Sequence, residues 1–255
     1  MDYSRLSASE RRTAPPAIAV SAVAFALGAP EGAELGDSGD TGPAGGGAGA
    51  GATDAGEAAE GTPWLPLVRR TREPFAGVWA LPGGPIPWDE TLAESAERTL
   101  RATVGASPGY LEQLYAFGDV ERSGRGQRLV TIAYWALYGE NDLVAPADPP
   151  VEPENIAWFS ADRLPELAFD HADIVEYALW RLRMKTEYAA VAHRFLGGTF
   201  TLAQLRRVHE AILGTEVDPA NFRRQALAQG HLVDTGDVET GTRHRPAKLY
   251  RFRER

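Results

Sequence analysis

The side chains of this chain best suited to chemistry lie in residues 84–106. Three glutamates, Glu90, Glu94 and Glu97, come just before or inside a predicted helix, and Arg98 follows them directly. Magnesium and manganese prefer carboxylate oxygens, and a bound divalent ion activates water and neutralises the charge that develops when a pyrophosphate is cleaved. One interpretation is a hydrolase that uses the three glutamates as an improvised set of metal ligands. The alternative, which we favour, places Glu94 and Glu97 on a solvated helix face.

The same segment, GPIPWDETLAESAERTLRATVGA, resembles the Nudix box. That family pattern has a glycine, a glutamate, an Arg-Glu pair, an aliphatic residue, two further glutamates and a final glycine at fixed spacing. The positions in register are Gly84, Glu90, Arg98, Leu100 and Gly105, with Leu-Pro-Gly just upstream. Where the resemblance places the three helix carboxylates, this chain has Thr99, Ala102 and Thr103.

These three departures from the family pattern affect whether the helix can hold a divalent metal ion. Side chains at positions 99, 102 and 103 share one helix face, so a full carboxylate set would hold a metal ion against the substrate. An alanine and two neutral hydroxyls cannot do so, and we expect Glu90 and Arg98 to brace the loop against the helix. The resemblance therefore implies a Nudix fold with no catalytic residues, no metal and no required cofactor.

The charge distribution indicates a second role. Residues 181–255 carry 14 basic and 8 acidic side chains, whereas residues 1–180 carry 12 and 27. A basic part joined to an acidic one favours a polyanionic partner for the basic part, although surface scatter is the alternative. The chain has no cysteine, which excludes disulfides, thiolate metal sites and cysteine nucleophiles. It shows no signal peptide and no apolar run long enough to span a membrane, so we expect a cytoplasmic protein.

The elements that would position these residues can be read along the chain. Residues 1–16 read as a flexible arm, and residues 17–27 as a buried strand. Residues 28–62 hold 12 Gly and 9 Ala without Lys or Arg, and predict a disordered insert between two paired strands, the second at residues 64–69. A helix over residues 91–104 is followed by strands at 110–119, 129–138 and 156–159 and a long helix at 170–188. This mixture is typical of an α/β (α+β) protein, and the Nudix resemblance implies that it forms a Nudix-like sandwich.

The last 65 residues carry clear helix signals. Thr201 and Gln204 form a capping box, and Gly214 ends the first helix. Asp218 and Pro219 begin a second helix, which runs to Gly230 and precedes strands at 231–234 and 248–252. Two helices followed by a hairpin are typical of a winged helix-turn-helix domain.

The second of these helices offers groups that read DNA. At 100° per residue, Phe222, Ala226 and Leu227 mark its buried side. Arginine suits guanine and asparagine or glutamine suits adenine in a major groove, and the basic hairpin loop would contact phosphates or a minor groove. The predicted DNA-binding residues are Asn221, Arg223, Arg224 and Gln225 on the helix and Arg243, His244, Arg245 and Lys248 in the wing.

The whole arrangement resembles the NrtR family of Nudix-related transcriptional regulators. The stretches that carry the resemblance are FAGVWALPGG, YLEQLYAFGD, VTIAYWAL, LAFDHADIV, FTLAQLRRVHEAILG, NFRRQ and PAKLYRF. It implies a Nudix-like effector-binding domain over residues 17–186 and a winged helix-turn-helix DNA-binding domain over residues 187–255. It further implies a homodimeric repressor of NAD biosynthesis or salvage genes that binds operator DNA and senses ADP-ribose or a related NAD metabolite.

A ligand with two phosphates and an adenine needs arginines and an aromatic face. The predicted effector contacts are Arg69, Arg70, Trp79, Arg125 and Arg128. His171 lacks a nucleophile nearby in the sequence, and we interpret it as a helix-start or interdomain hydrogen-bonding residue. Besides the Nudix hydrolase, the other function left open is a basic domain that binds protein or RNA.

Overall fold

The computed structural model describes residues 15–30, 33–36, 62–123, 127–143, 155–188, 191–240 and 246–253. Within these ranges, no helix is both long and apolar enough to cross a membrane. Residues 1–14 of the N-terminal arm, residues 31–32 and 37–61 of the predicted insert, and Arg125, Arg243, His244 and Arg245 lie outside the described residues.

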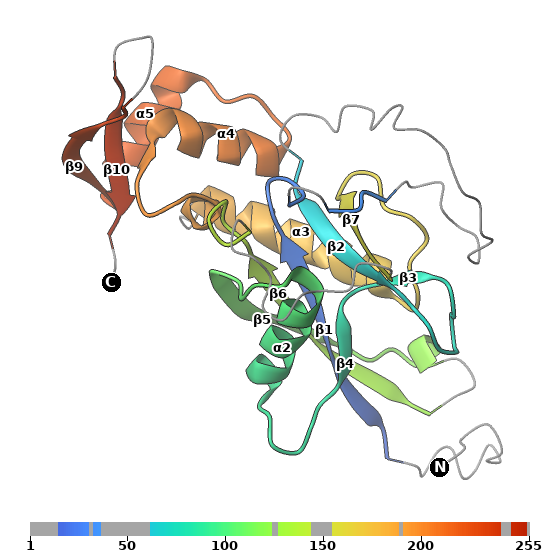
Figure 1. The fold of residues 1–255 in the computed structure, drawn as a ribbon. Helices are drawn as coiled ribbons and strands as arrows, with labels where there is room; N and C mark the ends of the chain where they lie inside the picture. The colour runs from blue at the N-terminus through green and yellow to red at the C-terminus, as the bar shows by residue number, and fades with distance from the viewer. Residues whose placement is uncertain are drawn as a thin grey trace.

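A four-stranded mixed sheet organises the N-terminal part (Figure 1). Its strand order is β4 (Gly83–Pro85), β1 (Ala17–Phe25), β6 (Leu129–Leu137) and β5 (Tyr110–Phe117). β1 is parallel to β6 over its whole length and antiparallel to β4, and β5 is antiparallel to β6. The predicted strands at 17–27, 110–119 and 129–138 are therefore confirmed. β4 lies beside β1 and begins the loop of residues 83–90 that leads to the helix of the Nudix-like segment, called the glycine loop below.

The second sheet is antiparallel, in the order β3 (Trp79–Ala80), β2 (Trp64–Arg69) and β7 (Ile156–Ser160). The prediction that β1 and β2 pair directly is wrong, because they belong to different sheets and are linked by a single bridge between Ala26 and Trp64. The prediction of disorder throughout residues 28–62 is also wrong at the start of that segment. Leu35 bridges Trp158 of β7, and the amide of Trp158 donates to the carbonyl of Glu34 at 2.8 Å.

Helices cover both sides of this framework. α2 (Leu92–Val104) buries Ala96 and Leu100, which pack in small apolar clusters with residues of β1 and β6. α3 (His171–Tyr188) buries Ile174, Ala178 and Leu182 in the main core, together with Trp135 and other side chains of both sheets. The spacing of four residues between these buried positions of α3 is the helical period expected of a core-facing stripe.

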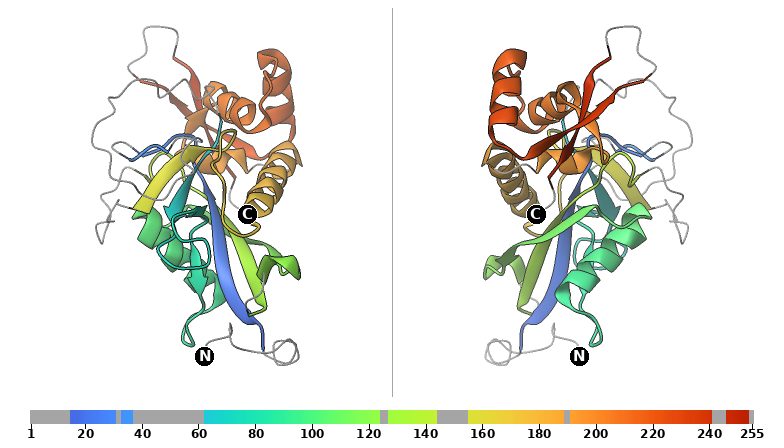
Figure 2. Two further views of the ribbon diagram at one scale, coloured as in Figure 1. Left: turned by 90° about the vertical axis from the view of Figure 1, so that its right-hand side faces the viewer. Right: turned by 90° about the vertical axis from the view of Figure 1, so that its left-hand side faces the viewer.

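The C-terminal part is a small helical unit with a three-stranded sheet, and it lies at one end of the molecule in all views (Figure 2). A short 3-10 helix, η4 (Ala192–Phe195), leads into β8 (Phe200–Thr201), α4 (Leu202–Leu213) and α5 (Pro219–Ala228). β9 (Leu232–Val238) and β10 (Lys248–Phe252) form the wing, and the sheet order is β8-β10-β9. Thr201 and Asp218 cap α4 and α5 as predicted.

Candidate effector site and DNA-binding face

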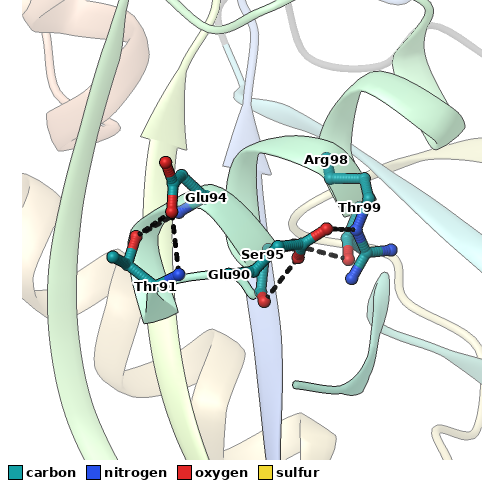
Figure 3. A network of polar contacts seen from close by, with 6 residues as sticks. All are labelled: Glu90, Thr91, Glu94, Ser95, Arg98 and Thr99. Carbon is teal, nitrogen blue, oxygen red and sulfur yellow. Dashed lines mark hydrogen bonds and ion pairs between the residues drawn. The ribbon is translucent and has the colours of Figure 1, made fainter. Parts of the chain in front are cut away.

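The glycine loop and α2 are joined by a network of polar contacts (Figure 3). Glu90 accepts a hydrogen bond from Nε of Arg98 at 2.6 Å and another from Oγ of Ser95 at 2.7 Å. These bonds, first of all the one from Arg98, hold the pKa of Glu90 below its usual value. Glu90 and Arg98 therefore brace the loop against the helix, as the sequence predicted.

The other two glutamates of the proposed metal set are also committed to the protein. Glu94 completes the capping box of α2, because its Oε2 accepts from the amide and hydroxyl of Thr91 at 2.8 and 2.7 Å. Glu97 accepts from Oγ of Ser107 at 2.9 Å and forms an ion pair with Arg101. Each carboxylate thus faces a different neighbour, and the described residues contain no cluster of three or more potential metal-ligating side chains.

At the three substituted positions of the box, the hydroxyls turn back onto their own helix. Oγ1 of Thr99 donates to the carbonyl of Ser95 at 2.8 Å, and Oγ1 of Thr103 donates to the carbonyl of Thr99 at 2.9 Å. Ala102 offers no oxygen on its side chain. A divalent ion needs several free oxygen ligands, preferably charged ones. The residues present at these three positions therefore do not fit the metal that the fold family implies.

Two of the predicted effector residues lie where β2 ends. The guanidinium of Arg69 lies over the ring of Trp79, 4.6 Å from its centroid. Arg70 donates to the carbonyl of Pro74 at 2.9 Å and lies 4.8 Å above the ring of Phe169. Trp79 itself is 4 % exposed and packs edge-on against Phe159. Trp79 therefore does not offer the free aromatic face that the sequence predicted, and it acts as a support for Arg69.

Arg128 lies apart from this pair. Its guanidinium donates to the carbonyl of Gly118, so it ties the two ends of the β5–β6 connection together. The structure thus brings Arg69, Arg70 and Trp79 to one edge of the second sheet, and Arg128 to the base of the neighbouring turn.

Sequence reasoning missed Arg122, which lies in that turn. Its side chain is 2 % exposed, forms an ion pair with Asp170, and approaches the ring of Phe169 from 5.7 Å. Burial lowers the pKa of Arg122 to about 10, which still leaves it charged at neutral pH. Arg70 and Arg122 therefore converge on Phe169 and place two positive charges beside the beginning of α3.

His171, the first residue of α3, is buried in the same place. Its Nδ1 accepts a hydrogen bond from the amide of Leu81 at 2.9 Å, so this nitrogen carries no proton. Burial, aided by the charges of Arg122 and Arg70, lowers the pKa of His171 to about 3. Its interpretation as a helix-start hydrogen-bonding residue is confirmed. Through it, the chain that enters the glycine loop is attached directly to α3.

The predicted DNA-reading side chains lie on α5 and the wing. Arg223, Arg224 and Gln225 are exposed, and Arg224 donates to Oδ1 of Asn221 at 2.6 Å. That bond holds the guanidinium of Arg224 beside the amide of Asn221, so both groups are presented together. Lys248 on β10 is exposed and forms an ion pair with Asp234 of β9 at 2.7 Å.

The prediction for the buried side of α5 is partly wrong. Phe222 is buried, packing edge-on against His209 of α4, and Ala226 is half-buried. Leu227, in contrast, is 39 % exposed, because α5 contacts α4 along a narrower stripe than the helical period indicated.

Comparison with known proteins agrees with this two-part arrangement. Residues 50–178 match the model of the NUDIX domain, and residues 192–252 match that of the NrtR DNA-binding winged helix domain. The chain is 34 % identical over 188 residues, 73 % of its own length and 74 % of the relative's, to the "ADPR responsive transcriptional repressor NtrR" of Acinetobacter baylyi. The chain belongs to the NrtR family.

The fold agrees with that of solved members of the NrtR family. The crystal structure of Shewanella oneidensis NrtR complexed with a 27mer DNA is similar with a TM-score of 0.67 and 30 % identity, over 92 % of this chain and 93 % of that one. An ADP-ribose pyrophosphatase of Methanocaldococcus jannaschii is 32 % identical over 116 residues, which are 45 % of this chain and 66 % of that protein. The similarity to the Shewanella oneidensis structure covers both parts of this chain, whereas the similarity to the pyrophosphatase covers less than half of it.

Proposed function

We propose that this protein is a DNA-binding transcriptional repressor of NAD biosynthesis or salvage genes that senses ADP-ribose or a related NAD metabolite. Residues 17–186 would form the effector-binding domain and residues 187–255 the DNA-binding domain, with the boundary in the last turn of α3. The observation that carries the proposal is the Nudix helix itself. Its metal positions hold Thr99, Ala102 and Thr103, while the chain continues into a winged helix whose α5 exposes arginines.

The effector would bind near the end of β2. Its diphosphate needs guanidinium groups, and Arg69 and Arg70 lie there, each over an aromatic ring. Arg125 and Arg128 remain predicted contacts from the β5–β6 side. Arg122 would act as a positioning residue, since its ion pair with Asp170 fixes the start of α3 next to Arg70.

The operator would be bound by two copies of the chain. Asn221, Arg224 and Gln225 would enter the major groove, and Arg223, at the margin of that helix face, would contact a phosphate. Lys248, with Arg243, His244 and Arg245, would contact the backbone or the minor groove. A homodimer presents two recognition helices to half-sites about one DNA turn apart, roughly 34–36 Å. The relative from Acinetobacter baylyi, named as a repressor responsive to ADPR, supports this assignment.

α3 provides a route between the two sites. At its beginning, His171 accepts a hydrogen bond from Leu81, and the preceding residue, Asp170, forms an ion pair with Arg122. Near its end, Arg183 donates to the carbonyl of Ile212 of α4 at 3.3 Å. Because α3 has no internal glycine or proline, a shift at its beginning is expected to move α4 as a rigid body.

The deciding experiment measures two affinities. Operator DNA, selected from random duplexes by the purified protein, is titrated with and without saturating ADP-ribose, and ADP-ribose is titrated with and without operator. We expect each ligand to weaken the other by the same factor, roughly 5–150-fold. If ADP-ribose binds and neither affinity changes, the sensor function is refuted. If RNA or protein binds the basic domain better than any selected DNA, the DNA-binding function is refuted.

A second assay tests the alternative that the protein is a Nudix hydrolase. The protein is incubated with ADP-ribose and magnesium or manganese, and the release of AMP is followed against a metal-free blank. We expect no difference from the blank, because Glu90, Glu94 and Glu97 are each bound to other protein groups. Metal-dependent AMP release that Glu97→Gln abolishes would establish the enzyme instead.

A further inference from the structure

A separate cavity, partly open to solvent, lies in the winged-helix part between α4, α5, η4 and the wing, and Thr186 of α3 also lines it. Its volume is about 210 Å³, and it is lined by Leu205 and Leu213 of α4, Phe222 and Ala226 of α5, Leu232 of β9 and Phe252 of β10. A dry apolar cavity of roughly 150 Å³ is large enough to bind benzene. This cavity is therefore large enough for a substituted ring or a fused pair of rings.

The chemistry of the walls indicates an uncharged ligand. Among the described residues that line the cavity, none is Asp, Glu, Lys or Arg. His209 lines it as well, and burial lowers the pKa of that histidine, which favours the neutral imidazole at neutral pH. An ion placed there would lose its hydration without a partner of opposite charge. A diphosphate such as that of the proposed effector does not fit this site.

His209 also indicates which polar group the ligand carries. Its Nδ1 lies 2.8 Å from the carbonyl oxygen of Leu205, and a carbonyl accepts, so Nδ1 bears the proton. In the neutral ring, Nε2 is then a hydrogen-bond acceptor. Gln229, the C-cap residue of α5, also lines the cavity, and its side-chain amide supplies a further acceptor oxygen. A ligand with one N–H or O–H donor would find a partner at this edge.

Aromatic side chains line the cavity on two sides. The ring of Phe252 stacks on that of His193 with centroids 3.8 Å apart and planes 3° from parallel. The ring of His231 lies 5.6 Å from Phe252 on a similar plane. On the helix side, Phe222 and His209 meet edge to face at 4.9 Å. Because these rings already contact one another, they offer an aromatic wall and not a free ring face, and such a wall favours an aromatic ligand over a branched aliphatic one through edge-to-face contact.

We propose that the winged-helix domain contains a second small-molecule site, which takes an uncharged, flat aromatic compound with one hydrogen-bond donor. The site lies on the inner side of α5, behind the side chains that we propose read DNA. It is distinct from the site proposed for ADP-ribose and does not rest on that proposal.

Indole is a suitable probe, because it is flat, uncharged and has one N–H donor. Binding to the full chain is measured by calorimetry and by the shift of the melting temperature. We expect one site per chain with a dissociation constant of about 1 mM or lower. His209→Phe keeps an aromatic ring and removes the acceptor, so we expect it to weaken indole binding about fivefold. No saturable binding up to roughly 5 mM indole would overturn the proposal.

Two variants of α5 locate the site. Ala226→Phe fills the cavity and should abolish indole binding, whereas Ala220→Phe adds the same side chain at an exposed position of the same helix and should leave it unchanged. Equal binding by both variants would place indole elsewhere and refute the site. If Ala226→Phe does not fold, Leu213→Phe fills the cavity from α4 and is compared with Ala220→Phe in the same way.

Discussion

His171 offers a sharp test of how the Nudix-like part is held to α3. The side chain is 5 % exposed, and its Nδ1 accepts the amide of Leu81 at 2.9 Å. Folding therefore keeps the imidazole neutral, with its pKa lowered to about 3, whereas the unfolded chain has the ordinary value of 6.5. We compare the wild type with His171→Asn, whose amide oxygen can accept the same hydrogen bond and does not titrate.

The direction in which the free energy of unfolding changes with pH follows from proton uptake by the unfolded chain. Above pH 6.5 the imidazole is neutral in both states, and its contribution to stability is fully present. As the pH falls below 6.5, the unfolded state gains a proton that the folded state does not take up until the pH approaches about 3. The free energy of unfolding should then fall by about 1.4 kcal/mol per pH unit.

Urea unfolding at pH 7.5 and 5.5 measures the effect. Between these values the wild type should lose about 1.4 kcal/mol more than His171→Asn, and the difference between the two curves isolates His171 from all other titrating groups. His171→Ala leaves the Leu81 amide without its acceptor and should be about 1–3 kcal/mol less stable than His171→Asn at pH 7.5. If wild type and His171→Asn change in parallel within about 0.3 kcal/mol, the buried neutral histidine is refuted.

Four further variants test other contacts. Asp170→Asn leaves the buried charge of Arg122 unpaired and should lower the free energy of unfolding by about 3–5 kcal/mol in urea; a loss below about 1 kcal/mol would show that the pair is solvated. Thr201→Ala removes the side-chain cap of α4 and should cost about 1 kcal/mol in the same assay, whereas an unchanged midpoint would contradict the capping box. Arg224→Ala should cost about 1–3 kcal/mol on selected operator DNA and less on random DNA. Lys248→Ala should weaken both DNAs similarly and reduce the salt slope by about one unit, and equal losses on both DNAs for Arg224→Ala would reduce its role to phosphate contact.

Local signals in the sequence were sufficient for much of the architecture. The capping box at Thr201 acts within one helical turn, so the sequence alone places the beginning of α4. The spacing of Glu90 and Arg98 likewise predicted a brace that the structure contains. Thr99, Ala102 and Thr103 are read directly from the sequence, and their side chains carry no carboxylate whatever the surrounding fold does.

Only the tertiary structure decided which distant groups meet. Arg122 and Asp170 are 48 positions apart, and Leu81 and His171 are 90 positions apart. No helical or strand period links such positions, because their approach depends on how the two sheets and α3 pack together. The same holds for Trp79, whose residue type indicated a ligand platform and whose place between the sheets makes it core. Composition and spacing determine which side chains can bind or read a ligand, whereas burial decides which of them remain exposed to do so.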